Sequence, residues 1–523
     1  MRSTQLMRHC VSLALISSLC VNLPASANDA PEIETLKRQI KQLQQTVEEL
    51  QNALQNVQQD ATAREQRIQR QLQALPSQVA PSPLDQAVQA VEARESHSPV
   101  RVDPPQGSRG QQRWIDVSFI PLFFAGSSSR REDGLRTLQA GGHDPAKRGF
   151  TLAQGELGLA GAVDPYFRAQ AYLTAAIDPV EGETIWELEE AFLTTQALPY
   201  GLQLEVGHFF TEFGQINPRH PHQWDWLDQP VINSRLFGPD GMRAPGFRTS
   251  LQLPTPWFSE FHVGMQNANG ETMTSFLGKR HAHGAEEEED GHAHEAEGDD
   301  DHAEEGPFRG DAIGNRPLIE RDVRALKDFT YLTRWNNFWE ITPSLSTLIG
   351  VSGLYGPNAT GRNGDTWIYG LDMKWRWRPT THFRGWPFVL WQTEIMRRNY
   401  HADRFTVVHD DDPTEVDTLP GRTLHDWGLY SQLLYGFRYG WAAGVRYEYA
   451  GGSGQSVGGG KNDPFRSERH RVSPLLAWHP SEFTRIRLQY NFDHANHLRN
   501  NQTAHSVWLG LEWLYGTHAP HEY

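Results

Sequence analysis

Cysteine is almost absent from the 523-residue chain, in which only Cys10 and Cys20 occur. Both fall within residues 1–27, which have the marks of a secretory signal peptide: a basic start, an apolar run and an Ala-Ser-Ala cleavage site. Cleavage would leave a mature chain without a thiol. Disulfide bonds, thiolate metal sites and cysteine catalysis are therefore excluded from its expected chemistry.

Long apolar runs are also missing, so no transmembrane helix is expected after residue 27. An excess of basic residues, which nucleic-acid binding requires, is missing as well. The formal net charge is −16, of which the segment 281–305 supplies −12, leaving −4 for the remainder.

We find no nucleophile motif and no phosphate-cradling glycine loop, so an enzyme is not expected. A lipase or protease embedded in a barrel is the enzyme alternative, and it would need a Ser/His/Asp-type constellation.

A heptad pattern runs through residues 28–74. Apolar residues from Ile33 to Ala61 are spaced alternately by three and four positions, as in the a/d seam of a coiled coil over four heptads. A self-associating α-helical coiled coil is the favoured interpretation, and a single amphipathic helix packed on a domain is the alternative. Residues 75–112, rich in Pro, Ser, Gln and Gly, are predicted to be a linker.

From residue 113 onward the hydrophobic period changes to two. In "TRIRLQYNFD" (484–493), for example, every second residue is apolar and the others are polar. A soluble β-sandwich would also alternate. Aromatic residues near strand ends and a regular alternation of short and long connections favour a transmembrane barrel instead.

We therefore predict an all-β fold for 113–523, an antiparallel β-barrel of about sixteen strands in the bacterial outer membrane, with the coiled coil in the periplasm. The short connections are predicted at 164–165, 197–199, 254–256, 342–343 and 479–480. The predicted strands lie near 113–124, 149–163, 166–178, 184–194, 200–209, 246–253, 258–267, 328–340, 344–354, 365–377, 388–399, 427–436, 440–450, 469–478, 483–493 and 504–515.

A barrel of this size is expected to enclose a water-filled lumen. The alternation of side chains indicates inward-facing residues of both charges, a mixture that favours a general diffusion pore for small hydrophilic solutes over a purely cation-selective channel. The predicted lumen residues are Glu187, Glu189, Glu205, Lys374, Arg376, Arg485 and Arg487.

The third long connection, 210–245, is rich in aromatic residues and proline, and we expect it to fold into the lumen. Its histidines and aspartates would meet Arg235 and Arg243 at a constriction, and imidazoles and carboxylates at such spacing can hold Zn²⁺ transiently. The alternative is that these groups only hydrogen-bond the loop to the barrel wall. The predicted constriction residues are Arg219, His220, His222, Asp225 and Asp228.

The fourth long connection, 268–327, contains the segment 281–305, with five histidines, twelve carboxylates and no basic residue. Imidazole with carboxylate is a good ligand set for Zn²⁺, so capture of a weakly bound metal ion is the favoured interpretation and a merely acidic spacer the alternative. Affinity should be modest, because an unfolded segment must be ordered around the ion. No cofactor is required. The candidate ligands are His281, His283, His292, His294 and His302.

Two stretches carry a resemblance to known proteins. "EEAFLTTQALPYGLQLEVGHFFTEFGQIN" (189–217) resembles the strand pattern of the phosphate-selective porin O/P-like family. Within that group, "FGQINPRHPHQWDWLDQPVI" (213–232), the His-rich loop and a terminal H-x-x-H resemble the zinc-regulated outer-membrane porins. The resemblance implies a sixteen-stranded barrel, trimers and expression linked to zinc supply.

The chain departs from that pattern in one respect, since its third loop has no dense Arg/Lys run. The sequence therefore predicts an outer-membrane porin for small hydrophilic solutes that aids uptake of zinc or another divalent ion. It would contact lipid and form homo-oligomers, with a trimer expected. An anion porin with a merely acidic surface loop and a structural barrel tethered to the cell wall are the alternatives.

Overall fold

The computed structural model describes residues 115–138, 141–177, 182–278, 313–408, 416–457, 463–498 and 501–516. These all belong to the unit Ala93–Tyr523. The predicted signal peptide, coiled coil and linker, the segment 281–305 with its five candidate ligands, and the C-terminal residues 517–523 lie outside the described residues. No helix in the described part of the chain is long and apolar enough to cross a membrane.

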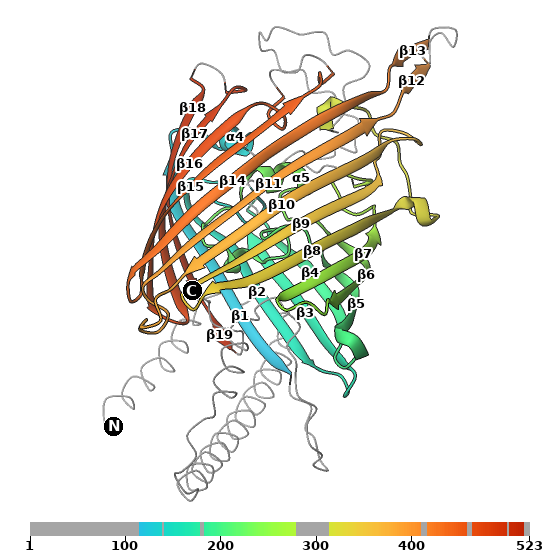
Figure 1. The fold of residues 1–523 in the computed structure, drawn as a ribbon. Helices are drawn as coiled ribbons and strands as arrows, with labels where there is room; N and C mark the ends of the chain where they lie inside the picture. Colours follow the sequence, from blue (N-terminus) through green and yellow to red (C-terminus); the bar gives the residue numbers. More distant parts are fainter. Residues whose placement is uncertain are drawn as a thin grey trace, which may run out of the picture. The chain divides into compact units, whose positions relative to one another are not determined.

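Sixteen antiparallel strands form a closed barrel (Figure 1). Each strand pairs with its neighbours in sequence order, and β1 also pairs with β18, which closes the sheet. The barrel strands are β1 (Asp116–Ser128), β2 (Gly149–Ala162), β3 (Phe167–Ile177), β4 (Thr184–Thr195), β5 (Leu202–Phe210), β6 (Arg243–Gln252), β7 (Phe258–Asn267), β8 (Phe329–Thr342), β9 (Leu345–Pro357), β10 (Asp365–Trp377), β11 (Phe388–Ala402), β14 (Arg422–Arg438), β15 (Trp441–Ser453), β16 (Arg469–Ser481), β17 (Thr484–Ala495) and β18 (Thr503–Trp513).

The remaining elements are short. β19 (Tyr515–Gly516) continues β18 along the start of β1, and β12 (Phe405–Val408) pairs with β13 (Val416–Leu419) in a hairpin between β11 and β14. The helical elements are α4 (Glu132–Arg136), α5 (Val231–Phe237) and the 3-10 turns η1 (Pro199–Gly201), η2 (Pro221–Gln223), η3 (Ile313–Asn315) and η4 (Leu326–Asp328).

The predicted antiparallel barrel of about sixteen strands is confirmed, and every predicted strand overlaps an observed one. One predicted turn is wrong. Residues 479–480 lie inside β16, and the turn to β17 falls at 482–483. The β16–β17 register shifts between Trp478 and Ser481. A local irregularity of this kind lets a strand include Pro480, which has no N–H to donate.

The connections alternate between two rims. The short-turn rim, which also carries both ends of the barrel sequence, has the connections 163–166, 196–201, 253–257, 343–344, 378–387, 439–440 and 482–483. The long-loop rim has the connections 129–148, 178–183, 211–242, 268–328, 358–364, 403–421, 454–468 and 496–502.

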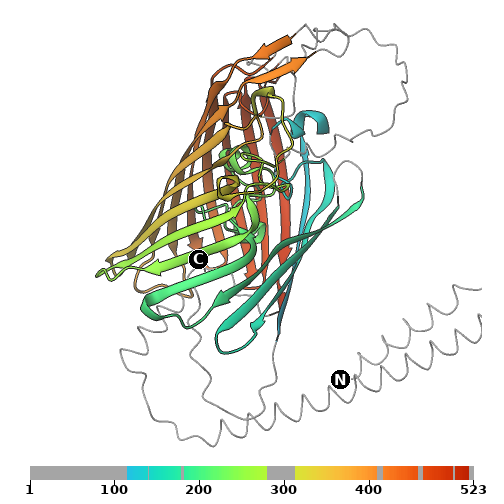
Figure 2. The same cartoon turned by 90° about the vertical axis from the view of Figure 1, so that its right-hand side faces the viewer.

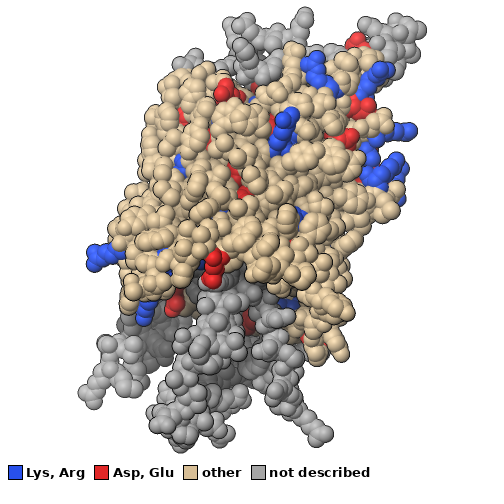
Figure 3. All heavy atoms as spheres, viewed as in Figure 1, with Lys and Arg blue, Asp and Glu red and all other residues tan. Residues whose placement is uncertain are grey.

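The outer surface of the barrel is apolar. Outward residues in the middle of the strands, such as Leu371, Leu433 and Leu488, are each 45–48% exposed. Aromatic side chains lie towards both rims, among them the Trp441–Trp478 stack near the short turns. Figure 3 shows one face of this surface, where charged side chains are few and the protruding lysines and arginines lie mostly near the edges. Two aromatic girdles around an apolar band are the outer surface that a bilayer-spanning barrel requires.

Much of the inside of the barrel is filled. Residues 211–242, here called loop 3, fold into the interior, and α5 lies between the walls of the barrel in both ribbon views (Figures 1 and 2). All seven residues of α5 are buried. The expectation of a water-filled lumen is therefore wrong where loop 3 lies, because loop 3 and the start of the connection 268–328 form a packed apolar core there.

Candidate functional site inside the barrel

Loop 3 enters and leaves the interior through a neck at the end of β5 and the start of β6. Asn217 ties this neck together: its amide nitrogen donates to the carbonyl of Thr211 (2.7 Å), and its Oδ1 accepts from the N–H of Met242 (2.8 Å). Gly214 and Gly241 adopt φ angles of 68° and 69°, in the left-handed region that favours glycine. The two ends of loop 3 are thus held together by hydrogen bonds, and glycines allow the backbone to turn there.

An apolar core holds the middle of the loop. Phe213 and Phe237 pack at a ring separation of 5.1 Å, and the cluster continues to wall residues such as Ile368 and Met396. Each fully buried side chain of this size contributes roughly 1.5–3 kcal/mol relative to an exposed one. Loop 3 is therefore part of the folded core and not a segment resting in solvent.

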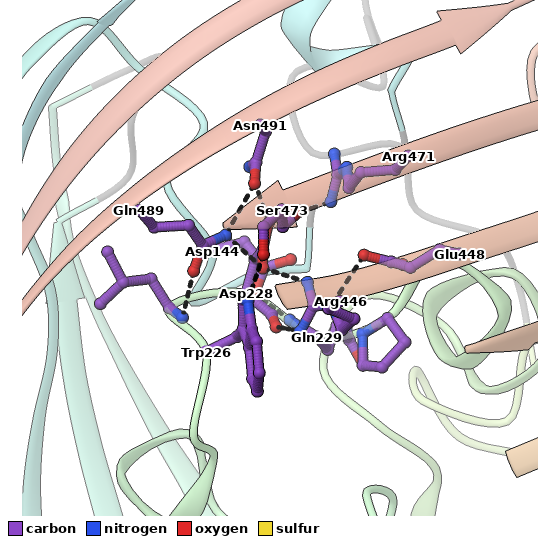
Figure 4. Close-up of polar contacts among 12 residues, drawn as sticks. Asp144, Trp226, Asp228, Gln229, Arg446, Glu448, Arg471, Ser473, Gln489 and Asn491 are labelled. Carbon is purple, nitrogen blue, oxygen red and sulfur yellow. Dashed lines mark hydrogen bonds and ion pairs between the residues drawn. The ribbon is translucent and has the colours of Figure 1, made fainter. Parts of the chain in front are cut away.

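Asp228 is the centre of a polar anchor on one side of the loop (Figure 4). Its carboxylate accepts from Arg446 on β15 and from Arg471 on β16, the latter at 2.9 Å. Gln489 and Asn491 on β17 donate to the same carboxylate at 2.8 and 3.0 Å. Burial would raise the pKa of Asp228, but the charges of Arg446 and Arg471 outweigh it and lower this pKa.

A second aspartate lies beside this anchor. Asp144, from the connection 129–148, accepts from the backbone N–H groups of Gly141 (2.7 Å) and Gln229 (3.0 Å). Burial, together with the charge of Asp228, raises the pKa of Asp144 to about 7. The first long connection is thereby joined to loop 3 by a carboxyl group that is not permanently charged.

Arginines of β17 form hydrogen bonds with the backbone of loop 3. Arg485 donates to the carbonyls of His222 (2.6 Å) and Trp224 (2.9 Å), and Arg487 donates to those of Trp224 (2.8 Å) and Trp226 (2.9 Å). These are charge-assisted hydrogen bonds to the turn η2 and to the irregular backbone that follows it. They satisfy carbonyls that would otherwise be buried without a partner.

The inward arginines of β15–β17 form what we call the arginine wall, and each is also paired with a carboxylate. Asp493 pairs with two of them and Glu512 with two others. Burying a guanidinium is costly unless it is paired and hydrogen-bonded, and these pairs meet that condition. The arginine wall consists of Arg446, Arg469, Arg471, Arg485 and Arg487.

On the other side, loop 3 meets the inward glutamates of β2 and β4. His220 is 5% exposed and lies between three of them. Its Nδ1 is 2.9 Å from Glu189 and 3.2 Å from Glu156, and its Nε2 is 2.8 Å from Glu190. We call the four glutamates on this side the acidic wall: Glu156, Glu187, Glu189 and Glu190.

Two further histidines reach the acidic wall. His222 Nδ1 lies 3.1 Å from Glu156, and His143 Nε2, from the connection 129–148, lies 3.4 Å from Glu189. The rings of His220 and His222 are stacked at 5.7 Å. Three imidazoles from two loops thus converge on glutamates of two strands.

A β-bulge explains how neighbouring glutamates can serve the same site. The β3–β4 register shifts so that Tyr172 pairs with Glu190 while Leu173 pairs with Leu188, which leaves Glu189 as the extra residue. Without the bulge, Glu189 and Glu190 would point to opposite faces of the sheet. With it, both are buried against loop 3.

Electrostatics favours cations in this part of the interior. Burial would lower the pKa of His220, but Glu156, Glu189 and Glu190 outweigh it and raise this pKa well above its usual range. For His143, burial is likewise outweighed by the hydrogen bond and charge of Glu189, which raise its pKa to about 9. The acidic wall therefore stabilises positively charged groups that lie against it, such as the protonated imidazoles of His220 and His143.

Two groups of described residues have the composition and spacing to hold a metal ion. They are Glu156, Glu189 and His220, and His143, Glu187 and Glu189, and in each group the ligand atoms lie within 4.8 Å of one another. The two groups share Glu189. Imidazole nitrogen with carboxylate oxygen suits Zn²⁺ and other first-row divalent ions.

The structure divides the predicted constriction residues between the two walls. His220 and His222 lie at the acidic wall and Asp228 at the arginine wall, all three buried, as in the alternative in which these groups hydrogen-bond the loop to the barrel. Arg219 and Asp225 remain partly exposed. Arg235 donates to the carbonyl of Ser467 (3.0 Å) and Arg243 pairs with Glu187, so these two arginines do not meet in one ring.

The predicted lumen residues likewise fall into separate places. Glu187 and Glu189 belong to the acidic wall and Arg485 and Arg487 to the arginine wall, whereas Glu205 pairs with Arg248 at 2.8 Å. Lys374 and Arg376 are partly exposed near the short-turn end of β10.

Several site residues are absent from the sequence predictions. Glu156, Glu190 and His143 were not identified, nor were Arg446 and Arg471. For Glu190 a signal exists: in "WELEEAF" (186–192) two successive glutamates interrupt the alternation, as a bulge does. The others carry no local signal, because the contacts that place them at the site join residues 46 or more positions apart in the chain.

Comparisons with known proteins give little beyond this geometry. No protein-family model matches the chain. An uncharacterized protein of Aquifex aeolicus (strain VF5) is 26% identical over 432 residues, which cover 78% of this chain and 80% of that protein.

Among solved structures, similar barrels are found at low scores. The anion-selective porin from Comamonas acidovorans has a TM-score of 0.44 and 8% identity, covering 77% of this chain and all of that one. The outer-membrane channel DcaP of Acinetobacter baumannii has the same score and identity, covering 77% and 97%. OprB of Pseudomonas putida has a TM-score of 0.44 and 9% identity, covering 77% and 94%. The resemblance to phosphate-selective and zinc-regulated porins remains a prediction.

Proposed function

We propose that the protein is an outer-membrane channel for small hydrophilic solutes, whose passage is narrowed by loop 3. The observation that carries this proposal is the combination of a closed sixteen-stranded barrel, an apolar outer band and an interior of charged side chains. Closed barrels satisfy all backbone hydrogen bonds within lipid, and a charged interior is stable there only when water or partners reach it.

The path for solutes would run beside loop 3. Partly exposed polar residues follow this route, namely Arg219 and Asp225 on the loop and Lys374 and Arg376 on β10. The first pair lies on loop 3 inside the barrel, and the second pair lies near the short-turn end of β10. Three of these four side chains are cationic and one is anionic, so this part of the proposed passage carries a small excess of positive charge.

The finer proposal is that the channel aids entry of Zn²⁺ or another divalent ion. The acidic wall and the histidines that lie against it support this proposal, because together they bring carboxylates and imidazoles to one place inside the barrel. The segment 281–305 would raise the local cation concentration at the long-loop rim. Assembly as a homo-oligomer, through the segment 28–74 and the barrel wall, is proposed with it.

Planar-bilayer recording tests the channel. Purified protein should give discrete conductance steps, and a heat-modifiable band in SDS gels should show that the barrel is folded. A folded barrel without conductance that still binds cell wall would favour the alternative of a tethered structural protein.

Two variants of 281–305 separate metal capture from simple attraction of cations. The first replaces the five histidines by Asn and keeps the twelve carboxylates, and the second replaces the carboxylates by Gln and Asn and keeps the histidines. If the segment captures metal, the effect of Zn²⁺ on the current should disappear with the histidines. If it disappears only with the carboxylates, the segment is an acidic spacer.

A further inference from the structure

The two sides of loop 3 are held by different kinds of charge. At the arginine wall, Asp228 and its neighbours pair with guanidinium groups, which are always protonated. At the acidic wall, Glu187 pairs with Arg243, but Glu156, Glu189 and Glu190 pair with imidazoles and with no Arg or Lys among the described residues.

None of these three buried carboxylates forms a close ion pair with a guanidinium in the part of the chain that the structure describes, although the charges of Arg243 and Arg248 act on Glu189 and Glu190 from a greater distance. Glu156 and Glu189 are 0% and 1% exposed, and an ionised carboxylate at such depth is costly unless a cation accompanies it. Neutral imidazole can donate only one hydrogen bond, yet both ring nitrogens of His220 face carboxylate oxygens. Either protons or a metal ion must supply the missing charge.

We propose that Glu156, Glu189 and His220 form a binding site for one first-row divalent metal ion, Zn²⁺ being the probe, which fastens loop 3 to β2 and β4. The distances from His220 Nδ1 to the two carboxylate oxygens are 2.9 and 3.2 Å. Ligands of a tetrahedral Zn²⁺ lie about 3.4 Å apart, given metal–ligand bonds of roughly 2.0–2.2 Å. The two distances from His220 are shorter than this by about 0.2 and 0.5 Å, and the two carboxylate oxygens lie within 4.8 Å of each other.

A second observation points to a ligand at this place. Buried polar atoms without a hydrogen-bond partner gather around the proposed site: Oε1 of Glu156, Oε1 of Gln154 and Oγ1 of Thr174. Gln154 donates its amide to Glu156 (2.9 Å), and Thr174 pairs in register with Glu156. Three oxygen acceptors without partners in one small region are the surroundings that a cation with its water would satisfy.

Neighbouring groups surround the proposed metal site but are not expected to be ligands of this ion. The rings of Tyr172 and Phe210 lie 4.6 and 5.3 Å from that of His220, which limits its movement and shields the ion from bulk water. The adjoining group of His143, Glu187 and Glu189 is the weaker position, because Arg243 already neutralises Glu187. One ion per chain is therefore expected.

The test uses full-length protein in detergent, with His281, His283, His292, His294 and His302 all replaced by Asn so that the external segment does not contribute. Isothermal titration with ZnCl₂ should show one bound ion per chain. His220→Gln and Glu189→Gln should each weaken binding at least tenfold. His262→Gln is the matched control: His262 is equally buried but faces a single carboxylate, Glu260, at 3.1 Å, and its loss should change affinity less than twofold.

The proposal would be overturned if the protein with its five external histidines replaced by Asn bound no Zn²⁺. It would also be overturned if the His220→Gln variant bound Zn²⁺ with unchanged affinity. Heat-modifiable migration shows whether each variant retains the barrel. If His220→Gln does not fold, the visible absorption of Co²⁺ bound to the protein with an unaltered interior tests the proposal instead. An intense band indicates nitrogen and oxygen ligands at low coordination number and supports the site. The weak band of the hydrated ion contradicts it. The outcome is independent of conductance, because a barrel that passes no solute can still bind the ion.

Discussion

The carboxylate of Asp228 lies 2.9 Å from Nη1 of Arg471, although 243 residues separate the two in the chain. This contact joins the middle of loop 3 to the far wall of the barrel. Because Asp228 also accepts from Arg446, Gln489 and Asn491, one side chain satisfies donors from three strands. The position of loop 3 depends strongly on this residue.

Asp228→Ala should therefore destabilise the protein and release loop 3. Removing one partner of a buried ion pair typically costs about 3–5 kcal/mol, because the other charge stays buried. We expect a loss of this size in the free energy of unfolding, measured by urea titration in lipid vesicles, and a larger single-channel conductance. Asp225→Ala is the control: Asp225 is partly exposed and accepts from Gln432 at 3.2 Å, so less than about 1.5 kcal/mol should be lost. Equal losses in the two variants would contradict the anchoring role.

A glycine in the wall makes room for the loop. A Cβ at Gly510 on β18 would come 2.2 Å from Cδ2 of Leu227, which is buried. Gly510→Ala should cost about 1–3 kcal/mol through this overlap. In the double variant with Leu227→Ala the two losses should not add, and the double-mutant cycle should give a coupling energy of about 0.5–3 kcal/mol. Gly155→Ala is a suitable control, since the nearest atom to its Cβ is 3.6 Å away.

A charged side chain on the outward face of the barrel should destabilise the protein in lipid. Leu371 on β10 is 48% exposed on the outside of the barrel, whereas Lys374 on the same strand faces inward. Leu371→Arg should reduce the stability of the barrel in lipid by about 2–4 kcal/mol if it lies near the bilayer centre. Lys374→Arg should change it by less than about 0.5 kcal/mol. Similar stability of the two variants in vesicles would show that this face does not meet lipid.

The long-loop rim should loosen at low pH through His497. Burial, together with the charges of Arg469 and Arg235, lowers the pKa of His497 to about 4, against the opposing effect of Asp463. The packed state therefore holds the neutral ring, whose Nδ1 lies 2.7 Å from Ser467 Oγ. This contribution to stability is fully present above the ordinary pKa of histidine, about 6.5, and is lost as the pH falls towards 4.

Hydrogen exchange measures this effect. The amides of Asn496 and Leu498, which donate to the carbonyls of Glu468 and Ala495, should become less protected between pH 6.5 and 4 in the unaltered protein, relative to His497→Asn, which cannot be protonated. The ratio of the two rates removes the intrinsic pH dependence of exchange. A ratio that stays constant over this range would contradict a neutral, buried His497.

The strands of this barrel are readable from the sequence because their signal is local. In "TRIRLQYNFD" the apolar side must meet lipid and the polar side the interior, so a period of two identifies β17 without knowledge of its neighbours. The same applies to most of the two rims, although the connection 378–387 on the short-turn rim is longer than 178–183, 358–364 and 496–502 on the other rim. Where a local irregularity intervenes, as at Pro480 or at the Glu189 bulge, the strand is found but its ends or its facing residues are not.

Loop 3 was predictable as an inserted segment but not in its contacts. Its aromatic and proline content indicated burial, which α5 and the apolar core around Phe213 confirm. Its polar residues, however, look alike in the sequence. Nothing local distinguishes Asp228, which is buried between arginines, from Asp225, which remains partly exposed.

The sequence by itself determined the class of the molecule, because hydrophobic alternation and connection length depend only on neighbouring residues. The tertiary structure decided the chemistry of the interior. Closing the barrel brings Glu156, Glu189 and His220 together on one side and Arg446 and Arg471 around Asp228 on the other, over sequence separations of 31 to 243 residues. Which charges meet depends on strand register and on the path of loop 3, and both are fixed only when the whole sheet has closed.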